Sequence, residues 1–290
     1  MRIGALEAGG TKMVLAVGDE RGKIFDIKSI PTVSPEVTVP LMIEYFNDEK
    51  IEALGIGCFG PICPDKSSDK YGYITSTPKL AWRDFNIVKA FKDVLKVPVG
   101  FDTDVNASCL GEATFGSAKG LKNVIYLTVG TGIGAGILSE GKLLHGNLHP
   151  EAGHIMMKRY EGDTYKGKCP YHADCFEGLA SGPALEERCK MTAKEIPADS
   201  EAFKAEAYYI AQALVSYILI LAPERIIMGG GVMHRLELFP LIRENVVKML
   251  NGYISTKQLE DIDCYIVPAS LNDDQGIIGC LVLGADAANK

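Results

Sequence analysis

An approximate internal duplication is the feature that most restricts how this chain can fold. Residues 2–8 form an apolar run that enters the turn Gly9-Gly10-Thr11, and residues 124–129 form a second run that enters Gly130-Thr131-Gly132. Each glycine turn is followed by another apolar run, a turn that ends in Gly-Lys, and a third run. A repeat of this kind indicates one supersecondary unit used twice. The sequence therefore predicts two similar lobes, each opening with a three-stranded antiparallel meander, around a cleft that binds a small ligand.

Composition narrows the class of protein. The chain has 290 residues, 47% of them hydrophobic, which is enough for two domains with cores of their own. Its 30 Lys and Arg against 37 Asp and Glu give a net charge of -7, the opposite of the balance that a charge-driven nucleic-acid or membrane-surface binder needs. Eight scattered cysteines, no signal-peptide pattern and no apolar run long enough to span a bilayer predict a cytoplasmic protein without membrane or nucleic-acid partners.

The hydrophobic pattern alternates between strand and helix periods, which predicts an α/β fold. We expect strands at residues 2–8, 13–17, 24–30, 53–59, 97–101, 124–129, 135–138, 142–144 and 225–228, and helices from Ser34 onward and at 104–115, 206–221 and 275–289. We place the boundary between an N-terminal lobe, residues 1–117, and a C-terminal lobe, residues 118–290. The last helix, about residues 275–290, is a candidate to pack back on the N-terminal lobe.

The sharpest local motif is Cys169-Pro-Tyr-His172-Ala-Asp-Cys175, with His154 upstream. Two thiolates and two imidazoles make a complete tetrahedral set for zinc, with no position left for water, so such a site stabilises a loop and does not catalyse. The alternative is a set of scattered core residues, but this run lies in a polar, glycine-bearing loop where packing gives no reason for it. We therefore predict a structural zinc site, which would fix the flanking carboxylates of Glu151 and Glu177.

The two glycine turns are candidate phosphate sites. Each offers backbone N–H groups and a threonine hydroxyl to phosphate oxygens. Neither is a Walker A motif, and Gly130-x-Gly132-x-x-Ala135 fits a dinucleotide fingerprint only loosely, because a strand pattern follows it instead of a helix. The alternative is that the glycines only make hairpin turns, and the duplication of the turns argues against it.

Asp104 lies where the strand predicted at residues 97–101 leads into a helix. A lone aspartate at that place is typical of a helix N-cap. The second interpretation is a general base that accepts the proton of a hydroxyl group as the hydroxyl attacks phosphorus. The local pattern alone leaves both open.

Taken together and in order, these motifs resemble the ROK family of sugar kinases and repressors. The segments that carry the resemblance span nearly the whole chain: Glu7 to Lys12, Gly60-Pro61, Asp104 to Ala107, Leu110-Gly111-Glu112, Gly130 to Gly134, Glu151-x-Gly-His154, the cysteine cluster, Ser181-Gly182 and Gly229-Gly230-Gly231. The resemblance implies two similar α/β lobes of the actin/hexokinase-like (ribonuclease H-like) fold around a cleft, with a zinc-bound loop. It also favours a homodimer.

The resemblance implies a role for particular positions. Asp104 would be the catalytic base, ATP and Mg²⁺ the cofactors, and Glu7 the carboxylate that supports the metal. The N-terminal lobe would hold the sugar and phosphate, and the C-terminal lobe the nucleotide and the zinc loop. The sugar would be bound by Gly60, Pro61, Thr103, Asp104, Glu151 and Glu177; ATP by Gly10, Thr11, Lys12, Gly130, Thr131, Gly132, Pro183, Gly230, Gly231, Val232, Met233, His234 and Arg235; and structural Zn²⁺ by His154, Cys169, His172 and Cys175.

Departures from the family pattern favour one sugar. Glucose-specific members often have Asn-Asp where this chain has Thr103-Asp104, and Glu-His-Gly-His where it has Glu151-Ala152-Gly153-His154. The family usually has Asp at the position of Glu7, and many relatives have a third cysteine at His172. The differences at Thr103 and Ala152, together with Phe59-Gly60-Pro61-Ile62 and residues 71–82, resemble the bacterial fructokinase branch, so we expect phosphorylation of D-fructose to D-fructose 6-phosphate.

Other functions remain as alternatives. A kinase for glucose, mannose or another hexose would use the same machinery. A sugar-responsive repressor would need a helix-turn-helix ahead of the first glycine turn, for which the residues before Glu7 leave no room, and an actin-like filament protein would not need a zinc loop or sugar carboxylates. Tyr71 and Trp82 are expected to be core or surface aromatics, with a lid over the sugar as the second interpretation. His145, His149 and His234 are given no catalytic role.

Overall fold

The computed structural model describes residues 1–197 and 199–289, which form two compact units. The first comprises Met1–Gly120, Leu143–Pro150 and the C-terminal segment from Ser270; the second comprises Leu121–Lys142 and Glu151–Ala269. The chain therefore returns twice to the first unit. The predicted boundary at residue 117 lies close to this division. Residues 143–150, which the prediction assigned to the C-terminal lobe, belong to the first compact unit. The end of the predicted range, residue 290, lies outside the described residues.

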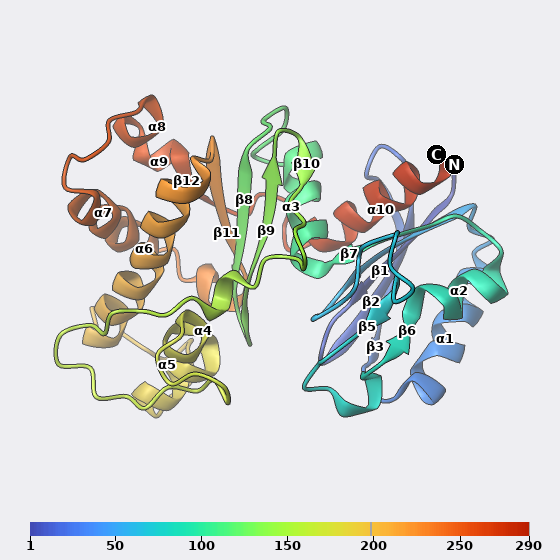
Figure 1. Cartoon of the computed structure of the whole chain (residues 1–290), viewed down its shortest axis with the longest axis horizontal. Coiled ribbons are helices and arrows are strands. Elements are labelled where there is room, and N and C mark those ends of the chain that lie inside the picture. Colours follow the sequence, from blue (N-terminus) through green and yellow to red (C-terminus); the bar gives the residue numbers. More distant parts are fainter. Residues whose placement is uncertain (198, 290) are drawn as a thin grey trace. The chain divides into compact units, whose positions relative to one another are not determined.

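The first unit is built on a five-stranded sheet in the order β3-β2-β1-β4-β7 (Figure 1). β1 pairs antiparallel with β2 and parallel with β4, and Glu7 of β1 lies opposite Val14 and Gly57 in these two ladders. The elements are β1 Ile3–Ala8, β2 Lys12–Gly18, β3 Ile24–Pro31, α1 Pro35–Asp48, β4 Ala53–Cys58, β5 Tyr73–Ile74, η1 Leu80–Trp82, β6 Phe85–Asn86, α2 Ile87–Leu95, β7 Val99–Thr103, α3 Asp104–Thr114 and α10 Gln275–Ala288.

The second unit repeats this plan in a second five-stranded sheet, ordered β10-β9-β8-β11-β12. An antiparallel meander is again followed by strands that run parallel to its first strand, as β11 does beside β8. The elements are β8 Val124–Val129, β9 Ile133–Ser139, β10 Lys142–Leu143, η2 Ala152–His154, α4 Phe176–Ala180, α5 Gly182–Cys189, α6 Glu201–Leu221, β11 Arg225–Gly229, η3 Gly231–His234, α7 Leu238–Leu250, α8 Lys257–Glu260, α9 Ile262–Tyr265 and β12 Ile266–Pro268.

Helices cover both faces of the first sheet. One apolar cluster joins the strands to α1 and α2 through Phe46 and Phe91, and a second joins them to α10 through Ile277 and Leu281. The red helix α10 packs on β1, β4 and α3 (Figure 1). A Cβ on Gly279 would lie 1.7 Å from the carbonyl oxygen of Ala107, so α10 and α3 approach so closely only because this residue is glycine.

The sequence predicted the meanders well and missed several shorter elements. Helices α2, α4, α5, α7, α8 and α9 and strand β12 were not predicted. The strand expected at residues 97–101 is β7, Val99–Thr103, because Lys96 ends α2 in the left-handed conformation and Pro98 has no N–H for the ladder. The helix expected at residues 206–221 begins at Glu201, since the Ser200 hydroxyl accepts the N–H of Phe203 and caps it.

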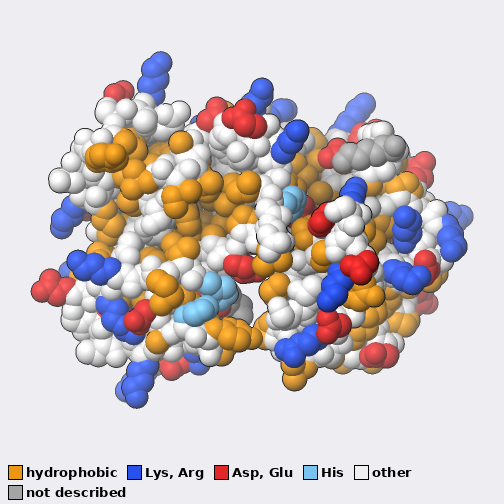
Figure 2. Space-filling view, viewed as in Figure 1, with side chains coloured by type: hydrophobic (Ala, Val, Ile, Leu, Met, Phe, Trp, Pro, Cys, Tyr) orange, Lys and Arg blue, Asp and Glu red, His pale blue; other side chains and the backbone are white. Residues whose placement is uncertain are grey.

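The surface shows no concentration of cations on the face seen in Figure 2. Lys and Arg side chains are scattered there among Asp and Glu, which agrees with the net charge of -7. Among the described residues, no helix combines the length and the apolar character that crossing a bilayer requires.

Candidate active site

Asp104 is the first residue of α3 and does not cap that helix. The cap is Thr103, whose Oγ1 accepts the N–H of Asn106 at 3.0 Å, so the N-cap interpretation of Asp104 is wrong. The Oδ1 atom of Asp104 accepts the N–H of Val105 at 2.9 Å. Burial raises the pKa of the Asp104 carboxyl above its ordinary value. The structure thus places a partly desolvated carboxylate directly after the edge strand β7, where it can act as a proton acceptor.

Thr103, which was predicted to bind the sugar, also caps helix α3. Its side chain is buried, and its hydroxyl oxygen is the acceptor in the α3 cap. The hydroxyl proton is left for a further partner, because a threonine hydroxyl both accepts and donates.

Glu7 lies in a group of carboxylates in the first unit. Its carboxylate oxygens pack over Gly276 in the first turn of α10. Burial and the nearby carboxylates of Asp104, Asp274 and Asp273 raise the pKa of Glu7 to about 7, and Lys12 only partly offsets them. A concentration of hard oxygen ligands with little positive charge beside it suits Mg²⁺, so these residues fit the metal that the resemblance implies.

Replacing Glu7 with Gln should make the stability of the protein less sensitive to pH. The unfolded chain loses this proton near pH 4.5 and the folded chain near pH 7, so the wild-type protein loses stability as the pH rises through that interval. The amide removes this loss, which amounts to at most about 3 kcal/mol. Urea unfolding in Mg²⁺-free buffer at pH 5 and pH 8 measures it. The exposed Glu44→Gln is the control, and an unchanged pH dependence in Glu7→Gln would contradict the assigned environment.

The first glycine turn is closed by the Gly9 N–H, which donates to the Lys12 carbonyl at 3.0 Å. Thr11 and Lys12 are exposed. Lys79, which the sequence analysis did not select, lies beside this turn: its Cε is 3.3 Å from the position that a Cβ on Gly10 would occupy. Its backbone N–H is held by the Thr77 hydroxyl. A second ammonium group therefore joins Lys12 at the turn predicted to bind phosphate.

The predicted sugar residues Gly60 and Pro61 lie in a turn that His149 supports. The His149 ring lies 3.2 Å from the position of a Cβ on Gly60, and its Nε2 accepts the N–H of Ile62 at 3.1 Å. Sequence reasoning gave His149 no role, because its partners are far away in the chain. The structure makes it the support of the Gly60-Pro61 turn.

Tyr71 and Trp82 belong to the core of the first unit and do not form a lid. Trp82 is buried, and its Nε1 donates to the Val33 carbonyl at 3.0 Å. Tyr71 packs edge-on against Phe101. The core interpretation of both aromatics is correct.

In the second unit the predicted nucleotide residues come together around the second glycine turn. Gly182 donates its N–H to the Gly130 carbonyl at 2.7 Å, which brings Pro183 beside the turn. Gly230 has a φ of 89°, and a Cβ there would meet the Val129 carbonyl at 2.6 Å. Backbone segments at Gly130, Gly182 and Gly230 therefore lie close together. Such an arrangement can line an anion or nucleotide site.

The 3-10 helix η3 presents the remaining predicted nucleotide residues. Val232 and Met233 are buried, and Gly231 and His234 are exposed. The Arg235 guanidinium stacks on Phe203 and donates to the carbonyls of Ala193 and Ile196. The side chain of Arg235 is thus engaged with the neighbouring segment, residues 193–203, of the second unit.

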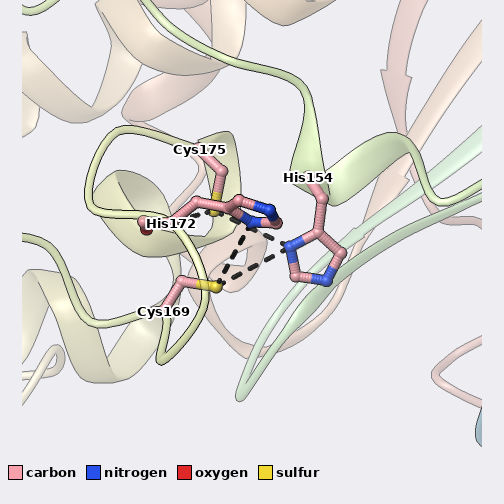
Figure 3. Close-up of side chains that lie close together, drawn as sticks. All are labelled: His154, Cys169, His172 and Cys175. Atoms are coloured by element: carbon pink, nitrogen blue, oxygen red, sulfur yellow. Dashed lines mark hydrogen bonds between the residues drawn. The ribbon is translucent and has the colours of Figure 1, made fainter. Parts of the chain in front are cut away.

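The four predicted metal ligands converge in the second unit (Figure 3). Their ligand atoms all lie within 4.8 Å of one another, and the Nδ1 atoms of His154 and His172 lie 3.7 to 3.8 Å from the cysteine sulfur atoms they face. Tetrahedral Zn²⁺ with ordinary bond lengths separates such atoms by about 3.6 Å. Burial raises the pKa of the Cys175 thiol to about 11, so a nearby cation would be needed to keep it as a thiolate. The donor set and its spacing fit zinc.

The cluster is connected to both predicted sugar carboxylates. Cys175 is the N-cap of α4, with its Sγ accepting the N–H of Gly178, and Glu177 lies in the first turn of that helix. The Glu177 Oε2 accepts the N–H of Ile133 at 2.9 Å, which ties α4 to the second glycine turn. On the other side, the Glu151 carbonyl accepts the N–H of His154 in η2. Glu151 and Glu177 belong to the second unit, and Gly60, Pro61, Thr103 and Asp104 to the first.

Comparison with known proteins identifies the family. The model of the ROK family matches residues 3–287. A protein of Bacillus subtilis (strain 168) is 52% identical over 286 residues, which are 98% of this chain and 96% of the relative. The chain belongs to the ROK family.

Further relatives cover the same length. A fructokinase of Pediococcus pentosaceus is 46% identical over 290 residues, 100% of this chain and 99% of the relative. Among solved structures, a ROK hexokinase from Thermus thermophilus has a TM-score of 0.80 at 24% identity and covers 100% of this chain and 99% of its own. This last likeness shows the two-lobed actin/hexokinase-like α/β fold that the sequence analysis predicted.

Proposed function

We propose that this ROK protein is a sugar kinase that phosphorylates D-fructose at the expense of ATP. The observation that carries the proposal is its full-length similarity to the Pediococcus pentosaceus fructokinase, at 46% identity. Fructokinases of Zymomonas mobilis and Streptococcus mutans, each 40% identical over 99% of this chain, support the same sugar. Thr103 and Ala152, which differ from the glucose-specific pattern, also favour fructose.

Asp104 is the proposed general base. Its Oδ1 is occupied by the Val105 N–H, which leaves the other oxygen for the 6-hydroxyl of fructose. As the hydroxyl oxygen bonds to the γ-phosphorus, its proton passes to Asp104, the bond from phosphorus to the bridging oxygen breaks, and ADP leaves. A pKa raised by burial brings the base closer to the pH at which it works. The products are D-fructose 6-phosphate and ADP.

The glycine turns are proposed to hold the phosphates of ATP through backbone N–H groups. Thr11 and Lys12 would serve the first turn and Thr131 the second. Pro183, Gly230 and Gly231 would border the nucleotide. Such contacts stabilise charge that develops on the transferring phosphoryl group.

Mg²⁺ is proposed to be held by Glu7, with Asp104, Asp273 and Asp274 adding negative charge around it. The metal would neutralise charge on the phosphates of ATP. Glu7 is one methylene longer than the usual Asp of the family, and its longer side chain would still reach a water molecule bound to the metal.

The cluster of His154, Cys169, His172 and Cys175 is proposed to hold a structural Zn²⁺. The ion would fix η2 and the start of α4, and with them Glu151 and Glu177. These two carboxylates are proposed to bind sugar hydroxyls. From the resemblance to the family we further propose a cytoplasmic homodimer, which light scattering on the purified protein tests.

Lys79→Met should raise the KM for ATP about tenfold and leave kcat for saturating ATP within twofold. The substitution removes an ammonium group from the first glycine turn while keeping the length of the side chain, and a charged hydrogen bond to phosphate is worth about that factor. Steady-state kinetics at fixed fructose measure it. Lys92→Met, on the exposed face of α2, is the control. An unchanged KM for ATP in Lys79→Met would show that Lys79 does not contribute to phosphate binding.

Identification of the product tests the proposed reaction. The protein is incubated with ATP, Mg²⁺ and fructose, and the product is followed by ³¹P and ¹³C NMR. Fructose 6-phosphate is expected. Phosphate at another carbon would overturn the proposed reaction, and the absence of turnover with fructose, glucose, mannose and N-acetylglucosamine would overturn the kinase.

A further inference from the structure

A buried carboxylate, Asp102, lies on β7 two residues before the proposed base. The residue is 4% exposed. Its Oδ1 accepts the N–H of Thr103 at 2.8 Å and the amide Nδ2 of Asn106 at 2.7 Å. Both donors are neutral, and a buried carboxylate that lacks a positive partner is costly to the fold.

His145 supplies the positive partner. Its Nε2 lies 2.9 Å from Asp102 Oδ2 and 3.1 Å from Oδ1. The hydrogen bond to Asp102 and the negative charge of that carboxylate raise the pKa of His145 above its ordinary value, although burial of the ring opposes the shift. Because the Asp102 carboxylate lies at hydrogen-bond distance from Nε2, this environment favours the positively charged, doubly protonated ring. His145 lies in the segment Leu143–Pro150, which returns to the first unit.

The residues that take part in these hydrogen bonds lie on both sides of Asp104 in the sequence. Asp102 precedes Asp104 and Asn106 follows it, and the Asn106 amide donates to Asp102 across the turn. The backbone N–H of Asn106 is fixed by the Thr103 hydroxyl. A shift of Asp102 would therefore move both ends of the turn on which Asp104 lies. Misplacement of a reacting group by about 1 Å costs on the order of a hundredfold in rate.

We propose that His145 is a positioning residue for phosphoryl transfer: as an imidazolium it holds Asp102 and thereby fixes the β7–α3 turn that carries Asp104. The inference rests on the proposed role of Asp104 as base. His145 itself is not placed against the substrate. Its effect is exerted through Asp102 and the turn.

The surroundings of His145 define how pH acts on it. The titratable groups that face it are Asp102 and His149, and the Asn106 amide 3.4 Å away is neutral. Burial lowers the pKa of His149, and its Nε2 accepts the Ile62 N–H, so His149 stays neutral. When His145 loses one proton, the Asp102 carboxylate favours the tautomer that keeps the N–H on Nε2, so the hydrogen bond remains and the ion pair is lost. The His145 ring then holds Asp102 less strongly, so kcat should fall modestly as the pH rises through the raised pKa of His145.

Two substitutions of similar size separate the hydrogen bond from packing. His145→Gln can keep an N–H donor near the position of Nε2 without a titratable group, and His145→Leu keeps bulk without a donor. Full-length variants are assayed with ATP, Mg²⁺ and fructose from pH 6 to pH 9, at a temperature below the Tm of each. We expect kcat of His145→Leu to fall at least about tenfold with KM for ATP within twofold. His145→Gln should recover kcat to within about threefold and lose the alkaline decline.

A second arm uses the partner carboxylate. Asp102→Asn removes the negative charge, so the pKa of His145, followed by NMR of its ring protons, should fall. The double variant Asp102→Asn/His145→Gln should be less impaired than the product of the two single effects predicts, because the residues act as a pair. Strict multiplication of the two effects on kcat would contradict the pairing.

The following results would contradict the positioning role of His145 or, separately, the proposed function. Wild-type kcat in His145→Leu, or a His145→Gln variant as slow as His145→Leu, would overturn the positioning role of His145. If His145→Leu does not fold, His145→Gln and the wild-type pH profile decide: an alkaline decline that persists unchanged in His145→Gln overturns it. Failure of the proposed function has a different signature, namely no turnover by the wild-type protein with any hexose, or full activity in Asp104→Asn.

Discussion

Asp104→Asn should lower kcat for fructose about 1,000-fold while the protein remains folded. The amide keeps the shape of the side chain and its place at the start of α3, but it cannot accept the proton of the 6-hydroxyl. General-base catalysis of this kind contributes about 10² to 10⁴ in rate. Since the interaction is made in the transition state, kcat and kcat/KM should fall by similar factors, with KM for fructose little changed. Steady-state kinetics by coupled ADP release measure both.

The control for Asp104→Asn is Asp93→Asn, which changes an exposed carboxylate on α2 that pairs with Lys89 at the surface. It should leave kcat within twofold of the wild-type value. Retention of more than a few per cent of wild-type kcat by a folded Asp104→Asn protein would show that another group accepts the proton. Thermal unfolding of both variants shows whether a loss of activity reflects a loss of fold.

Loss of the zinc site should have the largest effect on stability. Cys175 is both a proposed ligand and the N-cap of α4, so Cys175→Ser would release the ion and weaken the helix that carries Glu177. A ligand present at about 1,000 times its Kd stabilises the folded state by about 4 kcal/mol. We therefore expect Cys175→Ser, or removal of the metal with a chelator, to lower Tm by roughly 10 °C. Differential scanning calorimetry measures the change.

Metal analysis accompanies the unfolding measurement. Wild-type protein should contain about one zinc per chain, Cys169→Ser and Cys175→Ser much less, and Cys264→Ser, a substitution of an exposed cysteine away from the cluster, as much as wild type. Added Zn²⁺ should restore the Tm of the chelated wild-type protein and not that of Cys175→Ser. A metal-free wild-type protein with an unchanged Tm would contradict the structural site.

The fold was largely readable from the sequence because its main signals are local. Each meander has three apolar runs separated by glycine-bearing turns, and the observed strands β1, β2 and β3 match the predicted ones to within a residue or two at each end. The predicted start of β7 was two residues too early because Lys96 adopts a left-handed conformation, which the local sequence pattern does not indicate. Helices such as α5 were missed since their apolar residues are few.

The site was predictable where its residues are adjacent in the chain. The cysteine motif carries three of its four ligands within seven residues, and the structure brings His154 to them. The roles of His145 and His149 could not be found in the same way. Their partners, Asp102 and Ile62, are distant in sequence, and only the return of residues 143–150 to the first unit makes the contacts. The sequence also could not show that Thr103 and not Asp104 caps α3, because both residue types are good N-caps.

The preference among hexoses is the most direct test of the function proposed for this protein. Coupled ADP release with ATP and Mg²⁺ is measured across a range of concentrations of fructose, glucose, mannose and N-acetylglucosamine, with a sugar-free reaction as the blank. We predict the highest kcat/KM for fructose and only background turnover without sugar. A higher kcat/KM for glucose or mannose would keep the kinase and contradict the choice of fructose, and ADP release that is the same with and without sugar would contradict the kinase itself.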